Sequence, residues 1–337
     1  MSRALLYTEL GGGRVRCELC AHYCRLAPGQ SGICGVRHNH KGVLETRVGD
    51  LVIATHVDPI EKKPFFHVLP GTASYSLAAP GCNFHCRHCQ NYQISQLSRP
   101  LERLPGQHIA PEALVREARA TGCRSISFTY TEPTIYFELL LAVAARAREQ
   151  GLLNLIVSNG FMTAAARRKL AGLVNGANID LKAWSDSFYR RICGARSKLP
   201  VLETIAGLLA DGVWVEVTTL LIPGHNDAPG ELEEMAAFLV SLSPEIPWHV
   251  SGFFPTYRLT RVPPTPPETL LRARQIGLEA GLKYVFTGNR PGEGGEDTVC
   301  PGCGTLLLRR YGFRVLENHL QQGCCPVCGR SPAGIFV

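Results

Sequence analysis

Residues 81–95, GCNFHCRHCQNYQIS, carry three cysteines in the spacing C-x3-C-x2-C directly after a short apolar run at residues 74–79. Thiolates on one tight loop can each bind one iron of a four-iron cubane, although most electron-carrying cubanes use four cysteines. The fourth iron then has no protein ligand, and an open position marks a reactive metal site. Cys82, Cys86 and Cys89 therefore predict a catalytic 4Fe-4S cluster. The alternative is a fragment of a zinc site, but no further Cys or His follows at ordinary zinc spacing.

Strand and helix signals alternate on the C-terminal side of this loop. Residues 134–150 form a strongly apolar helical stretch that ends before Gly151, a usual residue just past a helix end. Residues 213–221 are continuously apolar and β-branched, which fits a strand buried on both faces. About six strand–helix repeats predict right-handed crossovers and a parallel sheet. We expect an α/β fold with a partial (β/α)6 barrel. A doubly wound open sheet is the alternative, but its Gly-x-Gly-x-x-Gly turn is absent.

The composition divides the chain into three parts. Residues 1–73 are rich in Gly, Pro and Cys, residues 74–290 carry the barrel pattern, and residues 291–337 begin with a linker and end in a cysteine module. Each part holds one cluster of the 14 cysteines, and only Cys123 and Cys193 stand alone. Clustered cysteines in a reducing compartment indicate metal ligands, whereas a lone cysteine is most often a small buried apolar residue.

The two outer cysteine clusters each offer four thiolates. At the C-terminus two C-P-x-C knuckles form a zinc-ribbon pattern, which predicts a zinc ion that stabilises a tail too small to bury a core. Zinc ribbons also bind nucleic acid, but residues 306–320 have few basic side chains. The N-terminal cluster suits either zinc or a second iron–sulfur cluster. The predicted ligands are Cys300, Cys303, Cys325 and Cys328 at the C-terminus, and Cys17, Cys20, Cys24 and Cys34 at the N-terminus.

The overall composition excludes several classes of protein. The chain has 337 residues, 45% of them hydrophobic and 19% charged, as in ordinary globular proteins. Its net charge of +7 favours anionic partners in general, but no run of five or more Lys/Arg supports nucleic-acid binding. The longest apolar stretch is too short to cross a membrane, and no signal peptide is recognisable. We expect a cytoplasmic protein without membrane or nucleic-acid partners.

The three-cysteine loop resembles that of the radical SAM superfamily, whose members use S-adenosylmethionine (SAM). Further strings resemble the pyruvate-formate-lyase-activating-enzyme-like branch, and most closely the radical SAM enzyme of the AmmeMemoRadiSam system. They are VDPIEKKP (57–64), TYTEPT (129–134), SNG (158–160), DLK (180–182), EVTTLLIPGHND (216–227) and PWHVSGFFP (247–255). The resemblance covers nearly the whole chain. It implies a partial barrel with the cluster at the C-terminal mouth of the strands, where such barrels place active sites.

The resemblance also implies the chemistry and the roles of individual residues. The reduced cluster would split SAM into methionine and a 5′-deoxyadenosyl radical, which abstracts hydrogen from the substrate. Glu132 would accept hydrogen bonds from the SAM amino group, a charge-assisted pairing. This chain has Tyr130-Thr131 where relatives have two glycines before the glutamate. His88 would lie flat against the adenine.

The remaining candidates lie at or near later strand ends. Ser158 and Asn159 would contact the methionine or ribose part of SAM. Asp180 and Lys182 would bind ribose hydroxyls or a cation and the SAM carboxylate, although a structural ion pair also explains two side chains on the same side of a strand. Further candidates for contacts with SAM or substrate are Glu216, Thr218 and His249. Residues 58–64 form either a solvated loop or a lid over the site.

Three functions follow as hypotheses. The first is a radical SAM enzyme that modifies a small molecule or peptide together with the companion proteins of its system, among them a Memo-like protein. The second is an activase that generates a glycyl radical on a partner protein. The third belongs to another class, a non-catalytic zinc-ribbon adaptor for nucleic acid or protein. Either enzyme needs a reductant such as flavodoxin or ferredoxin.

Overall fold

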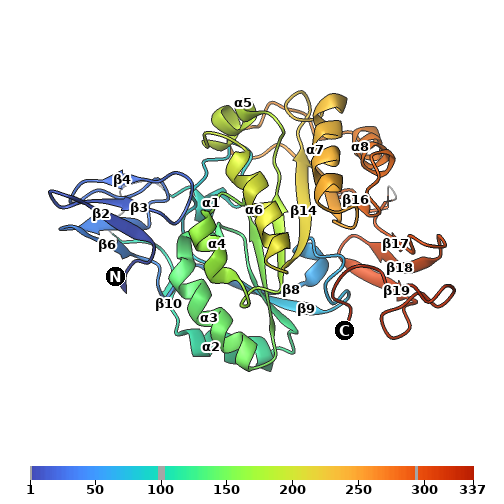
Figure 1. The fold of residues 1–337 in the computed structure, drawn as a ribbon, viewed down its shortest axis with the longest axis horizontal. Coiled ribbons are helices and arrows are strands. Elements are labelled where there is room, and N and C mark those ends of the chain that lie inside the picture. The colour runs from blue at the N-terminus through green and yellow to red at the C-terminus, as the bar shows by residue number, and fades with distance from the viewer. Residues whose placement is uncertain (1, 98–102, 293–294) are drawn as a thin grey trace.

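The computed structural model describes residues 2–97, 103–292 and 295–337 (Figure 1). Within this part of the chain, eight strands form one sheet in the order β16-β15-β14-β13-β12-β11-β9-β8. All neighbours from β9 to β16 pair in parallel, and β8 pairs antiparallel with β9 at the edge. The strands are β8 (Ala54–Pro59), β9 (Ala73–Ala78), β11 (Ser125–Phe128), β12 (Leu153–Ser158), β13 (Gly176–Asp180), β14 (Trp214–Leu221), β15 (Trp248–Gly252) and β16 (Val285–Gly288).

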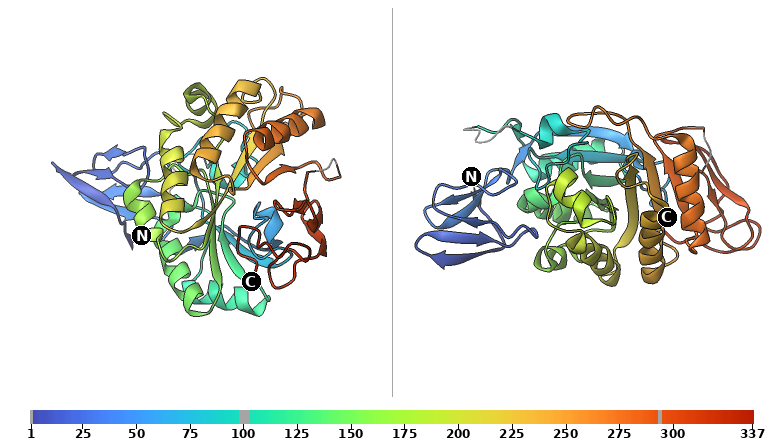
Figure 2. Two further views of the ribbon diagram at one scale, coloured as in Figure 1. Left: turned by 45° about the vertical axis from the view of Figure 1, so that its right-hand side comes forward. Right: turned by 90° about the horizontal axis from the view of Figure 1, so that it is seen from above.

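Helices connect the parallel strands and cover the outer face of the sheet (Figures 1 and 2). Because the strands follow one another in sequence order, right-handed crossovers place every connecting helix on the same face. The order shows no reversal, so the prediction of a partial β/α barrel is confirmed and the doubly wound alternative is wrong. The connecting helices are α2 (Pro111–Ala120), α3 (Phe137–Glu149), α4 (Ala164–Leu170), α6 (Leu199–Ala210), α7 (Pro229–Leu242) and α8 (Pro267–Glu279).

Short helical elements lie in the loops around the barrel. They are η1 (Ile60–Lys62), α1 (Tyr92–Ser95), η2 (Pro133–Tyr136), α5 (Asp186–Phe188) and η3 (Tyr189–Cys193). The π-helix η3 follows α5 directly and carries Cys193 at its end.

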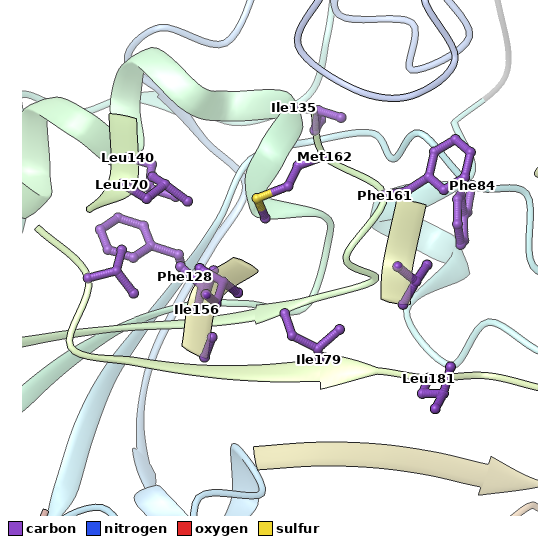
Figure 3. Packing of buried hydrophobic residues seen from close by; sticks show 14 of the residues in the cluster. Phe84, Phe128, Ile135, Leu140, Ile156, Phe161, Met162, Leu170, Ile179 and Leu181 are labelled. Atoms are coloured by element: carbon purple, nitrogen blue, oxygen red, sulfur yellow. The ribbon is translucent and has the colours of Figure 1, made fainter. Parts of the chain in front are cut away.

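The hydrophobic core lies between the sheet and its helices and reaches up to the cysteine loop, residues 81–95. Figure 3 shows Phe84 of this loop beside Phe161, which follows β12. The ring centroids of the two residues lie 5.2 Å apart, and both side chains are 1% exposed. Burying a phenylalanine contributes about 1.5–3 kcal/mol. This contact therefore fixes the cysteine loop to the barrel.

The N-terminal segment forms small antiparallel sheets at one side of the barrel (Figures 1 and 2). Strands β1, β6 and β5 form one sheet, β2, β3 and β4 another, and β7 pairs with β10. β8 lies before residue 73, the expected end of the N-terminal module, yet it pairs with β9 along its whole length. The bounds are β1 (Ser2–Arg3), β2 (Tyr7–Gly11), β3 (Arg14–Cys17), β4 (Arg25–Leu26), β5 (Arg37–His40), β6 (Val43–Thr46), β7 (Leu51–Val52) and β10 (Gln107–His108).

The C-terminal segment forms an antiparallel sheet of β17 (Thr298–Val299), β18 (Leu306–Tyr311) and β19 (Arg314–Asn318) on the opposite side of the barrel from the N-terminal sheets (Figure 1). A parallel bridge joins Val68 to Ile335, and the Nδ1 atom of His67 lies 2.7 Å from the Ala333 carbonyl oxygen. The chain end is thus tied to the segment just before β9. Among the described residues, no helix has the length and apolar character needed to span a membrane.

Candidate active site

A cavity of about 500 Å³ lies at the C-terminal ends of the parallel strands. Ligand pockets of drug-sized molecules have volumes of about 300–1,000 Å³, so the cavity can hold a ligand of that size. Its lining contains ten of the twelve residues that the sequence predicted for the catalytic cluster and for SAM or substrate. They are Cys82, Cys86, His88, Cys89, Glu132, Asn159, Asp180, Lys182, Thr218 and His249.

The cysteine loop starts at Gly81, where only glycine fits. Its φ is +99°, and a Cβ there would lie 2.9 Å from the Cys34 carbonyl oxygen. The loop is then held by the π-helix η3, because the backbone N–H of His85 donates to the Cys193 carbonyl at 2.8 Å and that of Arg87 to the Ile192 carbonyl at 2.9 Å. These two hydrogen bonds fix the loop to η3, while its start at Gly81 packs closely against the N-terminal segment.

Each thiol of the loop has a hydrogen-bonding neighbour. The Phe84 N–H lies 3.4 Å from the Cys82 sulfur, and the Ser95 hydroxyl lies 3.1 Å from the Cys89 sulfur. The third neighbour is the Cys193 thiol, whose hydrogen bond lowers the pKa of Cys86 against the opposing effect of burial. Hydrogen bonds to cluster-ligating sulfurs tune reduction potentials.

Cys193 was expected to be an apolar core residue. It is fully buried, but it lies against Cys86, a predicted cluster ligand. The Cys193 sulfur lies within hydrogen-bonding distance of the Cys86 sulfur. It can therefore donate to Cys86, but it lies too close to that sulfur to bind a different iron of the same cubane. The sequence offered no signal for this contact, because Cys193 has no partner cysteine nearby along the chain.

The distances between sulfur atoms distinguish the three cysteine clusters. Zinc with bonds of about 2.3 Å to four sulfurs requires sulfur–sulfur distances below about 4 Å. Across the described residues, one group of three or more Cys, His, Asp or Glu ligand atoms lies within 4.8 Å, and it consists of Cys300, Cys303, Cys325 and Cys328. Cys300 and Cys328 are 3.5 Å apart at sulfur, and Cys303 and Cys325 are 3.6 Å apart. The C-terminal quartet therefore fits a zinc ion, whereas the trio in the cysteine loop is too widely spaced for one.

The N-terminal cysteines gather without reaching zinc spacing. Burial, followed by the proximity of Cys17, Cys34 and Cys24, raises the pKa of the Cys20 thiol. Cys24 lines a separate hollow of about 810 Å³, which contains no other predicted site residue. The module nevertheless touches the barrel beside the cysteine loop, since Cys20 bridges to Met162.

Glu132 is the most strongly constrained carboxylate of the cavity. One of its oxygens accepts hydrogen bonds from the Thr134 N–H at 3.0 Å and the Ser158 hydroxyl at 2.7 Å, and also from the Thr134 hydroxyl. The other accepts the Asn159 N–H at 2.8 Å. Burial raises the pKa of Glu132 despite these donors. Ser158 therefore orients Glu132 and does not line the cavity itself, and the second oxygen keeps room for another donor.

Asp180 and Lys182 form an ion pair on the cavity wall, with 2.8 Å between Lys182 Nζ and an Asp180 oxygen. Burial alone would lower the pKa of Lys182, but the Asp180 carboxylate and the Cys86 thiolate raise it well above its ordinary value. A positive charge is thus held beside the cysteine loop. The structural ion pair and the expected SAM-binding role are compatible, because both side chains face the cavity.

His88 lies in the cavity wall and carries no charge. Burial, followed by Lys182, lowers the pKa of His88 to about 3. Among the described residues its Nδ1 atom is buried without a hydrogen-bond partner. A neutral ring with an unpaired nitrogen at the cavity is suited to contact a bound heterocycle.

Glu216 departs from the expected role, because it does not line the cavity. Its carboxylate is fully buried and accepts the backbone N–H groups of Phe66 at 3.0 Å and His67 at 2.9 Å. It also accepts the Trp214 indole N–H at 3.1 Å, and the His249 ring nitrogen lies 2.6 Å away. Glu216 therefore positions His249 and the chain at 66–67, whereas His249 and Thr218 reach the cavity.

Two segments outside the parallel strands complete the cavity wall. Lys63 and Glu61 line it and are 2% and 1% exposed, so the alternative of a solvated loop at residues 58–64 is wrong. From the other side, Glu296, Gly312 and Phe313 of the C-terminal segment line the same cavity. The sequence predicted that this segment is stabilised by zinc but did not predict its place in the cavity wall.

Arg310 fixes the C-terminal wall to the barrel. The guanidinium donates to the Phe66 carbonyl at 2.7 Å and to the Thr298 hydroxyl at 2.8 Å, and it lies 4.4 Å from the Phe66 ring centroid. Because Phe66 is also held by Glu216, the wall and the sheet share one buried polar network.

Comparisons with known proteins place this site in a family. A sequence profile of the Radical SAM superfamily matches residues 77–239. The chain is 42% identical over 332 residues to the uncharacterized protein MJ0808 of Methanocaldococcus jannaschii, covering 98% of each. A radical SAM methyltransferase from Sphaerobacter thermophilus has a similar fold, with a TM-score of 0.50 and 18% identity over 66% of this chain and 68% of that one. SuiB from Streptococcus suis also reaches a TM-score of 0.50, at 15% identity over 68% of this chain and 52% of its own.

These structural likenesses show a shared fold, and the sequence match spans the strands that carry the cysteine loop, Glu132 and Asp180. The enzyme hypothesis is thereby confirmed over the non-catalytic adaptor. The chain belongs to the radical SAM superfamily and is a radical SAM enzyme.

Proposed function

We propose that the chain cleaves SAM reductively at a 4Fe-4S cluster bound by Cys82, Cys86 and Cys89, and that the 5′-deoxyadenosyl radical abstracts hydrogen from a small-molecule or peptide substrate. The observation that carries this proposal is that the cysteine loop borders an open cavity. Its three thiols border a cavity of about 500 Å³ at the barrel mouth and are spaced too widely for zinc. When bound, the cluster supplies the electron that breaks the carbon–sulfur bond of SAM.

Side chains of the cavity have the chemistry needed to bind SAM. The second oxygen of Glu132 can accept the SAM ammonium, and this pairing is charge-assisted. Lys182 offers a positive charge to the SAM carboxylate, and Asp180 can accept ribose hydroxyls. The neutral His88 ring can stack against adenine. These residues orient SAM and exclude water from the reaction.

The C-terminal segment favours a small molecule or a peptide as substrate. Gly312 and Phe313, in the turn between β18 and β19, line the cavity together with the segment around Lys63. An activase must admit a glycine-bearing loop of a large folded partner, whereas a cavity walled from both sides suits a smaller substrate. We therefore place glycyl-radical formation second.

The resemblance to the AmmeMemoRadiSam enzyme extends this proposal to partners and location. We propose that the enzyme acts in the cytoplasm with a Memo-like companion and receives electrons from flavodoxin or ferredoxin. The N-terminal cysteines support a metal site of their own, and their spacing beyond zinc distances favours a second iron–sulfur cluster there. The C-terminal quartet would hold zinc.

The proposal is tested with anaerobically reconstituted full-length protein, SAM and dithionite. We expect 5′-deoxyadenosine from the native chain and none from Cys86→Ala. The matched control is Cys123→Ala, which removes a buried cysteine of the barrel far along the chain from the loop and should retain SAM cleavage. Cleavage by Cys86→Ala equal to that of the control would refute the assignment of the cluster.

A further inference from the structure

A cluster of charged side chains lines the cavity on the side of β8, and neither the cofactor nor SAM accounts for it. Asp58, on β8, accepts a hydrogen bond from Lys62 at one oxygen and from Lys63 at the other, each at 2.7 Å. The Tyr130 hydroxyl donates to the second oxygen as well. We call these four residues the Asp58 cluster.

The Asp58 cluster has an excess of positive charge. Two ammonium groups share one carboxylate, and hydrogen bonds from Lys62, Lys63 and Tyr130 hold the pKa of Asp58 well below its ordinary value even though burial opposes this. Asp58 is therefore ionised and compensates only one of the two lysines. Lys62 is 45% exposed at its side chain and can be solvated, but Lys63 is 2% exposed. The cluster therefore carries one uncompensated positive charge, and both of its lysines line the cavity.

The carboxylates that line the cavity have other partners. Asp180 pairs with Lys182, Glu132 accepts its donors from residues 134, 158 and 159, and Glu296 accepts the Gly312 N–H at 3.1 Å. Glu61 accepts the Gly71 N–H at 2.8 Å, and burial raises its pKa, with Arg310 as the nearby cation that opposes this shift. Among the described residues, Asp58 is the carboxylate that forms an ion pair with Lys63.

Tyr130 contacts the Lys63 side chain, although its own backbone adopts a strained conformation. Lys63 Nζ lies 4.1 Å from the Tyr130 ring centroid, a cation–π contact. Tyr130 has a φ of +62°, in the left-handed region that glycine adopts without strain. A tyrosine at such a position requires side-chain contacts that compensate, and the Asp58 cluster provides them. The Tyr130 carbonyl also accepts the Asn91 side-chain amide at 2.8 Å, which ties the cluster to the cysteine loop.

We propose that Lys63 binds an oxyanion of the substrate, a carboxylate or a phosphate, in the cavity beside the cysteine loop. The inference rests on the proposed function, since it takes the cavity to be the substrate site. The anion supplies the missing counter-charge, while Asp58 and Tyr130 hold the ammonium group in place. Lys63 is thereby a substrate-binding residue, distinct from Lys182, which serves the SAM carboxylate.

The test measures binding of two probes, inorganic phosphate and succinate, to the full-length reconstituted enzyme saturated with SAM, by isothermal titration calorimetry. We expect at least one probe to bind without displacing SAM, and the stronger probe identifies the class of oxyanion. Lys63→Met should weaken that binding at least tenfold. Lys283→Met is the matched control, because it removes the same charge from a partly exposed pair with Glu245 and should leave affinity within twofold.

A second variant keeps the test valid if Lys63→Met does not fold. Lys63→Gln removes the charge but keeps a donor toward Asp58, so it should also weaken binding of the same probe at least tenfold. Absence of saturable binding to the native enzyme, competition of the probe with SAM, or unchanged binding in either Lys63 variant would each overturn the proposal. Binding does not require SAM cleavage, so failure of the anion site and failure of the radical chemistry are distinguishable.

Discussion

Replacement of Glu216 tests how the cavity wall is held together. The carboxylate accepts the N–H groups of Phe66 and His249 at one oxygen and those of His67 and Trp214 at the other. In Glu216→Gln, an amide NH2 replaces one oxygen. The better orientation turns the NH2 toward His249, whose ring can change tautomer and accept, and leaves the Phe66 N–H without an acceptor.

The expected loss of stability follows from the number of buried donors left without an acceptor. One buried donor without a partner costs about 1–3 kcal/mol, so we expect Glu216→Gln to lower the free energy of unfolding by that amount. Glu216→Leu removes every acceptor and should cost about 3–5 kcal/mol, as for other broken buried charge networks. The control is Glu245→Gln, in a partly exposed pair with Lys283, for which less than about 1 kcal/mol is expected.

The assay is urea denaturation of the zinc-loaded protein, followed by tryptophan fluorescence. Of the three tryptophans, Trp214 donates directly to Glu216. Both Glu216 variants should also show a loosened C-terminal wall, because Phe66 links Glu216 to Arg310. Equal stability of Glu216→Gln and Glu245→Gln would refute the view that this carboxylate organises the wall.

Three further predictions concern the metals and the charge at the cavity. Cys193→Ala removes a hydrogen bond of about 1 kcal/mol from Cys86 and should lower the cluster reduction potential by about 40 mV or less in a redox titration, whereas Cys193→Ser retains a donor and should preserve it. Cys303→Ser should release zinc in a metal analysis and expose residues 296–313 to proteolysis, yet leave the iron content unchanged; loss of iron would contradict separate sites. Burial, opposed by Asp58 and reinforced by Lys62, lowers the pKa of Lys63 to about 8, so succinate affinity should be highest below pH 8 and fall as the pH rises through it, with Lys63→Met showing no such fall.

The repeating part of the fold was predictable because its signals are local. A strand covered on both faces must be apolar throughout, and residues 213–221 show this pattern where β14 forms. β8 carries His and Asp within ATHVDP and has no such pattern. Its place in the sheet depends on pairing with β9, which the sequence of β8 does not encode by itself. The boundary at residue 73 stays a prediction for the same reason.

The candidate site was predictable where its residues share one loop or one strand end. Cys82, Cys86 and Cys89 are neighbours in sequence, so their spacing indicates joint binding of iron. Glu216 shows the limit of this reasoning, because alternation along a strand gives the face of a side chain but not whether it ends in the cavity or beneath it.

Cys193, Lys63 and Tyr130 reach the site through contacts between distant segments. Tyr130 did carry a signal, since the family pattern that the sequence resembles has glycine there, and the structure shows a positive φ. The identity of the N-terminal metal stays a prediction.

The most direct test of the central claim is Mössbauer spectroscopy of the 57Fe-reconstituted enzyme with and without SAM. If three thiolates leave one iron without a protein ligand, SAM must change the signal of a single iron in the cubane. We expect this change in the native enzyme and in Cys193→Ala. Four irons that all remain unaffected by SAM would show that every corner has a protein ligand and would contradict the account.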